Sequence, residues 1–171
     1  MIVYSRLKHR LVGELLLLAD GVQLFGVYYA DHEIAPPIEN GWRRDPGHRV
    51  LSKAATQIGE YLDGKRKTFS LRLRLDGTPF QRNVWERIAE IPYGEVVSFS
   101  ELAARAKVPR AVRAVGAACG RSPFEIVIPT HRVVSKAGGY GGYAGAWNRK
   151  KGLLKLEGIP ETVVAKRPKG K

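Results

Sequence analysis

The stretch SFSELAARAKVPRAVRAVGAACG, residues 98–120, decides the fold of the second half of the chain. It contains two short apolar-periodic segments separated by a proline turn. Such a pair is typical of a helix-turn-helix, although the same arrangement occurs in proteins that never contact DNA. In chain order we expect a cap at Ser98 or Ser100, a helix over 101–106, a turn at 107–109, and a second helix over 110–119 that Gly120 closes.

The second of these helices combines two arginines, Arg110 and Arg113, with a row of small residues. Small side chains let a helix backbone approach its partner closely, which favours insertion into a narrow groove over base reading by long side chains. Close packing of the helix inside its own domain is the alternative reason for small residues. The row consists of Ala111, Ala114, Gly116, Ala117 and Ala118.

Upstream, residues 78–94 predict a further helix and its end. Thr78 is a suitable cap, Pro79 suits the first helical position, and the helix should run to Ala89 before Pro92-Tyr93-Gly94 breaks it. We therefore expect a mainly helical domain over residues 76–160, followed by a basic tail over residues 161–171 in which 166–171 are solvated and available to phosphates.

The first 75 residues differ from the rest in combining predicted strands with one predicted helix, and this pattern predicts a small α/β domain. In chain order we expect a hairpin of Val12–Leu18 and Val22–Tyr29 around Asp20-Gly21, a loop over 36–47, a helix over 48–62 that stops at Gly64, and a strand with one basic face over 69–75. The fold class is accordingly α+β in two domains, 1–75 and 76–160.

Composition limits the class of partner. Lys and Arg number 29 against 16 acids, giving a net charge of +13, which favours polyanions, with nucleic acid ahead of an anionic membrane surface. Cys119 is the single cysteine, and the four histidines lack metal-ligand spacing, so we expect no metal and no cofactor. Charges from Arg6 to Arg10 preclude a signal peptide, and Leu15–Leu18 is too short to span a bilayer. We expect a monomer in the cytoplasm, the nucleus or the nucleoid.

Downstream, the apolar run 125–128 leads into Pro129-Thr130-His131-Arg132. A loop rich in Gly and Tyr follows over 138–145, and then a last helix over 150–156 that ends at Glu157-Gly158. The chain here closely resembles the O6-alkylguanine-DNA alkyltransferases, also called methylated-DNA–protein-cysteine methyltransferases. The blocks that match in order and spacing are Thr78-Pro79-Phe80-Gln81, Val84-Trp85, Ile91-Pro92-Tyr93-Gly94-Glu95, Arg113-Ala114-Val115-Gly116, Ile128-Pro129-x-His131-Arg132-Val133 and Leu154-x-Leu156-Glu157-Gly158.

The resemblance covers about residues 76–160, and residues 1–75 fit the variable N-terminal domain of that family, which is ribonuclease-H-like. It implies a DNA-repair activity that binds duplex DNA in the minor groove, flips out an O6-alkylated guanine and transfers the alkyl group irreversibly to a cysteine. The acceptor position is Thr130, His131 deprotonates the acceptor through a water, and Glu157 orients His131. Arg113 fills the space of the extruded base, with Arg110, Ala114, Ala117 and Phe99 as further DNA contacts, and Pro129, Val133, Tyr143, Ala144 and Trp85 line the pocket.

Three residues depart from the family pattern. Phe99 lacks the hydroxyl that many members offer to the flipped guanine, and Ser122 stands where an asparagine often braces the hinge. The third departure is decisive, because Thr130 occupies the place of the nucleophilic cysteine. An alcohol is far less acidic than a thiol, and a β-branched one has restricted rotamers. We expect lesion binding without alkyl transfer, and we expect Cys119 to be inert core packing rather than a substitute.

Two accounts of Thr130 are open at this point. In one, a catalytic alkyltransferase was altered deliberately so that it stays unreacted, and the retained pair of His131 and Glu157 favours this account. In the other, the chain is a natural alkyltransferase-like protein that binds alkylguanine and recruits other repair factors. A third hypothesis, a sequence-specific helix-turn-helix regulator, predicts major-groove footprints and a preferred sequence instead.

Overall fold

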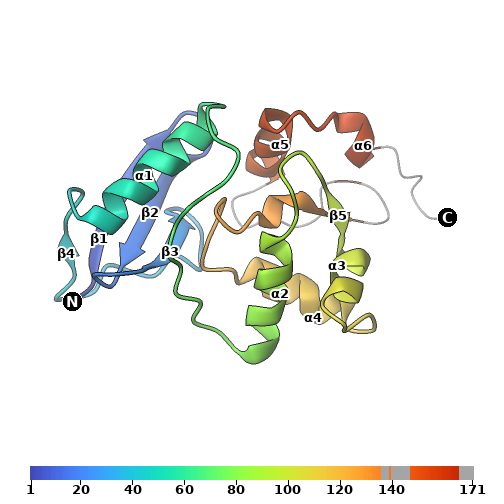
Figure 1. The fold of residues 1–171 in the computed structure, drawn as a ribbon, viewed down its shortest axis with the longest axis horizontal. Coiled ribbons are helices and arrows are strands. Elements are labelled where there is room, and N and C mark those ends of the chain that lie inside the picture. The colour runs from blue at the N-terminus through green and yellow to red at the C-terminus, as the bar shows by residue number, and fades with distance from the viewer. Residues whose placement is uncertain (136–138, 140–146, 166–171) are drawn as a thin grey trace. The chain divides into compact units, whose positions relative to one another are not determined.

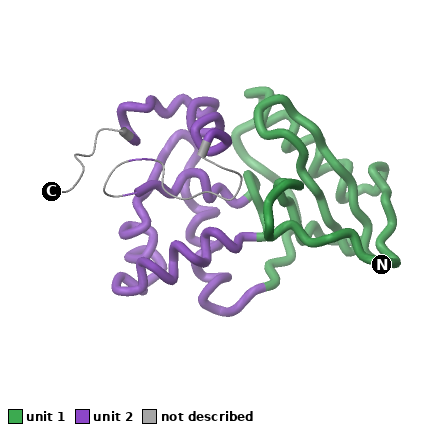
Figure 2. Tube along the Cα trace, turned by 180° about the vertical axis from the view of Figure 1, so that it is seen from behind, with its two compact units in different colours: residues 1–76, 123–127 green, residues 77–122, 128–171 purple. Residues whose placement is uncertain are grey.

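The computed structural model describes residues 1–135, 139 and 147–165, and its ribbon is drawn in Figure 1. The chain separates into two compact units, Met1–Asp76 with Pro123–Val127 and Gly77–Ser122 with Ile128–Lys171 (Figure 2). The return of 123–127 to the first unit was not part of the expected boundary at residues 75 and 76. The elements are β1 Val3–His9, β2 Gly13–Ala19, β3 Leu24–Tyr29, β4 Arg43–Arg44, α1 Arg49–Leu62, α2 Pro79–Ala89, β5 Val97–Ser98, α3 Phe99–Arg105, α4 Val112–Gly120, η1 Thr130–Arg132 (a 3₁₀ turn), β6 Val133–Val134, α5 Trp147–Leu156 and α6 Glu161–Ala165.

The first unit is a four-stranded sheet in the order β3-β2-β1-β4, with α1 lying across it (Figure 1). β2 pairs antiparallel with both β1 and β3, whereas β4 runs parallel to β1. Residues Leu15–Ala19 of β2 are all buried, which is why this strand is a continuous apolar run and not an alternating one. The Asp20 carboxylate accepts bonds from the amides of Val22 and Gln23, so the expected hairpin turn is confirmed.

One expectation for this unit was wrong. Residues 69–75 form no strand: the segment is extended but makes only one isolated bridge, Leu73 with Leu24. The alternation of apolar and polar residues therefore reflects a single extended segment with one half-buried side, and not a strand paired in a β-ladder. Two charged residues near the N-terminus lie within β1. Arg6 and Lys8 lie on the exposed side of β1, and Val3 and Ser5 on its buried side.

The second unit begins with α2, as expected. Thr78 and Gln81 form a reciprocal capping box, and Pro79 occupies the first helical position. Ser98, and not Ser100, caps α3 by accepting the amide of Glu101. α4 starts at Val112, two residues later than expected, and Gly120 is its last residue.

The turn between α3 and α4 closes with two bonds, from the Lys107 amide to Ala104 and from the Val108 amide to Ala103. This is a Schellman pattern, which places one residue in the left-handed region. Lys107 takes that place, with φ of 62°. Asn83 of α2 donates to the carbonyl of Ala106 and so fixes the turn against α2.

The rest of this unit differs from the expected elements in three ways. α5 begins at Trp147 and not at Lys150, and β5 and β6 form a short parallel pair. Residues 161–165 are helical and not part of a basic tail, because Val164 is buried with Val134, Leu154 and Ile159. Residues 166–171 lie outside the described part of the chain.

Candidate active site

The acceptor position lies in a buried turn. η1 spans Thr130–Arg132, and Thr130 is only 6% exposed. Directly after η1, Val133 and Val134 pair in parallel with Val97 and Ser98. Since Ser98 also caps α3, the backbone around Thr130 is held in register with the first residue of that helix.

Glu157 is placed by the end of α5. Beyond the last helical residue, the amide of Gly158 bonds the carbonyl of Lys155 and the amide of Ile159 bonds that of Leu154. This Schellman motif needs a left-handed residue, and Gly158 supplies it with φ of 80°. Glu157 thereby becomes the C-cap residue, and its side chain points inward with no exposed surface.

The carboxylate of Glu157 binds three groups at once. His131 Nε2 lies 2.6 Å from Oε2, Arg132 Nε donates to Oε1 at 2.8 Å, and the Gly94 amide donates to Oε1 at 3.0 Å. Gly94 has φ of 82°, a conformation that favours glycine and aims this amide at the carboxylate. The sequence suggested the pairing of His131 with Glu157, and the structure brings these two side chains together.

The electrostatics of the cluster favour a neutral histidine beside an ionised acid. Burial raises the pKa of Glu157, but the hydrogen bonds from His131, Arg132 and the Gly94 amide more than offset this and lower it to about 2. Burial lowers the pKa of His131. A neutral imidazole donates its Nε2 proton to the carboxylate, so any proton taken from residue 130 must pass through Nδ1.

Sequence reasoning missed two further members of this site, Arg132 and Lys150. Lys150, on α5, has no exposed surface, and its Nζ donates to the Val133 carbonyl at 2.5 Å. The same Nζ lies 5.8 Å from the centroid of the Phe99 ring, and burial lowers the pKa of Lys150 to about 8. A lysine in an amphipathic helix ordinarily faces solvent, so nothing in the pattern of α5 indicated this.

Cys119 does not take part in this cluster as a nucleophile. It lies on the buried side of α4 with Val115 and Ala118. Burial raises the pKa of its thiol to about 12, which keeps it protonated at neutral pH. The expected core position of Cys119 is confirmed, and its inertness stays a prediction.

α4 presents its small residues in two directions. Arg113, Ala114 and Ala117 are exposed, as is Arg110 just before the helix. Ala118 faces inward, and its carbonyl accepts the indole Nε1 proton of Trp85 at 2.8 Å. Internal packing therefore accounts for Ala118 but not for the exposed alanines.

The remaining expected pocket residues differ in what the structure shows. Pro129 and Val133 are buried on either side of η1. Trp85 is 2% exposed and joins α2 to α4, so its placement indicates a packing role. Tyr143 and Ala144 lie outside the described residues.

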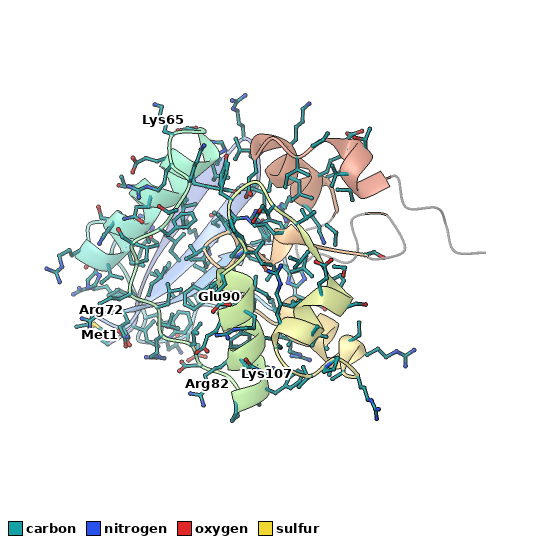
Figure 3. All side chains as sticks on the ribbon, turned by 45° about the vertical axis from the view of Figure 1, so that its right-hand side comes forward. Met1, Lys65, Arg72, Arg82, Glu90 and Lys107 are labelled. Atoms are coloured by element: carbon teal, nitrogen blue, oxygen red, sulfur yellow. The ribbon has the colours of Figure 1, made fainter. Side chains whose placement is uncertain are left out.

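The positive charge of the chain is concentrated in the second unit. The first unit holds 12 of the 29 Lys and Arg with 10 of the 16 acids, leaving 17 basic residues and 6 acids for the second. Figure 3 shows the side chains, with Arg82 of α2 and Lys107 of the α3–α4 turn labelled. Within the described residues, no helix is long and apolar enough to cross a membrane, and no group of three metal-binding side chains gathers.

Comparison with known proteins shows the family. A family model described as the DNA-binding domain of 6-O-methylguanine DNA methyltransferase matches residues 79–159. The methylated-DNA–protein-cysteine methyltransferase of Mycobacterium tuberculosis is 39% identical over 146 residues, which cover 85% of this chain and 87% of that protein. The chain belongs to this DNA-repair family.

Two further matches cover most of the length of both proteins compared. The methylated-DNA–protein-cysteine methyltransferase of Haemophilus influenzae is 37% identical over 150 residues, covering 87% of this chain and 83% of that protein. A crystal structure of the Mycobacterium tuberculosis protein OGT in complex with DNA matches with a TM-score of 0.83 at 34% identity, covering 96% of each chain. The α+β class is thereby confirmed, whereas the ribonuclease-H-like and helix-turn-helix descriptions stay predictions.

Proposed function

We propose that this chain binds duplex DNA containing O6-alkylguanine from the minor-groove side, extrudes the alkylated base and holds it without transferring the alkyl group. The observation that supports this proposal is the combination of an assembled His131–Glu157 pair with a threonine at residue 130. His131 and Glu157 are hydrogen-bonded as a base and its orienting carboxylate would be, yet the buried turn that contains His131 carries a threonine and not a cysteine at residue 130.

A hydroxyl at residue 130 does not replace the thiol. Alkyl transfer requires attack at an alkyl carbon, for which the thiolate is the reactive form because of its low pKa and its intrinsic nucleophilicity. The reference pKa of a cysteine is about 8.5, within reach of a neutral histidine, whereas an aliphatic hydroxyl is far less acidic. Burial of Thr130 to 6% exposure makes an alkoxide less favourable still.

DNA recognition is assigned to the exposed side of α4. Its surface combines Arg113 with Ala114 and Ala117, so a cation able to occupy the vacated base position stands beside residues that allow close approach. The other side of α4 packs on α2 and α3, which gives the helix a fixed support. Arg110 extends the basic surface toward the phosphates.

The intact hydrogen bonding of Glu157 favours an acceptor exchange in a catalytic site over a lineage that never transferred alkyl groups, because a pure binding protein has no use for a neutral buried base. A natural alkyltransferase-like protein that recruits other repair factors is the second candidate, and Thr130 itself favours it. The genomic codon for residue 130 separates the two: a cysteine codon supports the exchange, and a threonine codon supports the natural binding protein.

Fluorescence anisotropy with matched duplexes tests recognition. The chain should bind a duplex with one O6-methylguanine more tightly than the same duplex with guanine, and equal affinities would contradict the proposal. A 2-aminopurine reporter beside the lesion measures base extrusion in the same duplex. Arg113→Ala should reduce extrusion more than affinity, whereas Arg82→Ala, which removes an exposed arginine of α2, serves as the matched control.

A further inference from the structure

Arg132 makes more contacts with Glu157 than His131 does. Its Nε lies 2.8 Å from Oε1 and 3.2 Å from Oε2, and its Nη2 lies 3.1 Å from Oε2. The remaining guanidinium nitrogen, Nη1, donates to the Ile91 carbonyl at 2.6 Å, and the ring of Tyr93 lies 5.6 Å from Cζ. With 6% of its surface exposed, this arginine is fixed in one orientation.

The carboxylate of Glu157 is thus shared between a permanent cation and a titratable ring. A guanidinium stays protonated in proteins, so it compensates the Glu157 charge at every working pH. A histidine that faced the carboxylate without such compensation would be drawn toward imidazolium, because an opposite charge at hydrogen-bond distance favours the charged form. An imidazolium can no longer accept a proton from residue 130.

We propose that Arg132 is a positioning residue that compensates the charge of Glu157, so that His131 keeps the neutral form with its proton on Nε2 and its Nδ1 able to act as a base. The use of His131 as a base rests on the part of the proposed function that treats the site as an alkyltransferase site with an exchanged acceptor, whereas the protonation state of His131 does not depend on the proposed function.

Every charged group that the described structure places around His131 fits this role. Burial is the main reason why the pKa of His131 is lowered; Arg132 and Lys150 act in the same direction, and Glu157 opposes them. Tyr93, before β5, has its pKa raised by burial and by Glu157, which keeps the phenol neutral. Cys119 of α4 couples to Lys150 and is itself held neutral by burial. Among the described residues that affect the pKa of His131, Glu157 alone favours the imidazolium, and Arg132 binds its carboxylate directly.

The geometry also explains why an arginine serves here. Its planar fork reaches both carboxylate oxygens and leaves Nη1 for the Ile91 carbonyl, which a lysine ammonium could not do from one position. Removing the positive charge should raise the pKa of His131, because a nearby like charge disfavours the imidazolium and the Glu157 carboxylate would then act on the ring uncompensated. Retaining the charge in a different shape should change that pKa much less.

The test is ¹⁵N NMR of histidine-labelled protein across pH 5 to 8, in the Thr130 chain itself. His131 should show the neutral tautomer protonated on Nε2 at pH 7. Arg132→Gln should move its titration to higher pH, Arg132→Lys should stay close to the unaltered chain, and Arg121→Gln, an exposed arginine just after α4, should change nothing. Combining Arg132→Gln with Glu157→Gln should abolish the rise, since no carboxylate remains to favour the imidazolium.

The proposal is overturned if His131 of the unaltered chain is an imidazolium at pH 7, a result that needs no variant to fold. It is also overturned if folded Arg132→Gln titrates like the unaltered chain, or if Arg132→Lys shifts as far as Arg132→Gln. Failure of the proposed function would appear separately, as equal affinities for alkylated and unmodified duplexes with the His131 titration unchanged.

Discussion

Replacing Glu157 by glutamine tests how much the buried cluster contributes to stability. In the folded chain the pKa of Glu157 is lowered to about 2 from an ordinary value of 4.5. A carboxylate with a lowered folded-state pKa stabilises the protein above its unfolded-state pKa, and this contribution is lost as pH falls toward the folded-state value. The difference of about 2.5 units corresponds to about 3 kcal/mol at pH 7, falling to about 1.5 kcal/mol at pH 3.

Glu157→Gln removes this contribution and leaves the Arg132 guanidinium without its compensating charge, a change that costs several kcal/mol in other buried pairs. Urea unfolding followed by tryptophan fluorescence at pH 7, 5 and 3 measures the free energy of unfolding. Glu157→Gln should lower it by about 3 kcal/mol or more at pH 7, and this difference from the unaltered chain should become smaller as pH falls. Glu161→Gln, which removes an exposed ion pair with Lys151, should lower the free energy of unfolding much less than Glu157→Gln at pH 7. If the free energies of unfolding of Glu157→Gln and of the unaltered chain differ by the same amount at all three pH values, Glu157 does not have a lowered pKa in the folded chain.

Three further predictions concern the helices around the site. Cys119 should not react with a thiol reagent at pH 8 in the folded chain and should react fully in urea, because burial raises its pKa to about 12; rapid reaction of the folded protein would contradict this. Lys107→Gly should raise the free energy of unfolding by about 0.5–1 kcal/mol, since glycine adopts a φ of 62° without strain, whereas Lys107→Ala should give no gain. Ala117→Leu should weaken duplex binding by roughly tenfold, and Ala104→Leu, on the exposed side of α3, should not.

Local chemistry made α2 and its cap predictable from sequence. Thr78, Pro79 and Gln81 satisfy the first amides of the helix among themselves, so no distant residue decides where it starts. The turn at Asp20-Gly21 was predictable for the same reason. By contrast, the pairing of β5 with β6 joins residues far apart in the chain, and two-residue strands carry no periodicity that a sequence could display.

The residues of the site divide in the same way, into those that a local motif predicts and those that depend on distant contacts. The family motif pointed to His131 and Glu157, and the end of α5 at Gly158 gives the local reason why Glu157 turns inward. Neither Arg132 nor Lys150 could be recognised as buried, because charged residues are usually solvated and only their tertiary partners reveal otherwise. The strand predicted over 69–75 was wrong for a different reason. Strict alternation predicts an extended chain, but it does not show whether a neighbouring strand is present to pair with it.

Covalent transfer at residue 130 decides whether this chain can accept an alkyl group from DNA. The Thr130 chain and its Thr130→Cys variant are each incubated with duplex DNA that carries radiolabelled O6-methylguanine, and the label on protein is measured after denaturation. We expect no label on the Thr130 chain and stoichiometric label, located at residue 130, on the variant. Label on the Thr130 chain, or a folded and DNA-binding cysteine variant that stays unlabelled, would contradict this expectation.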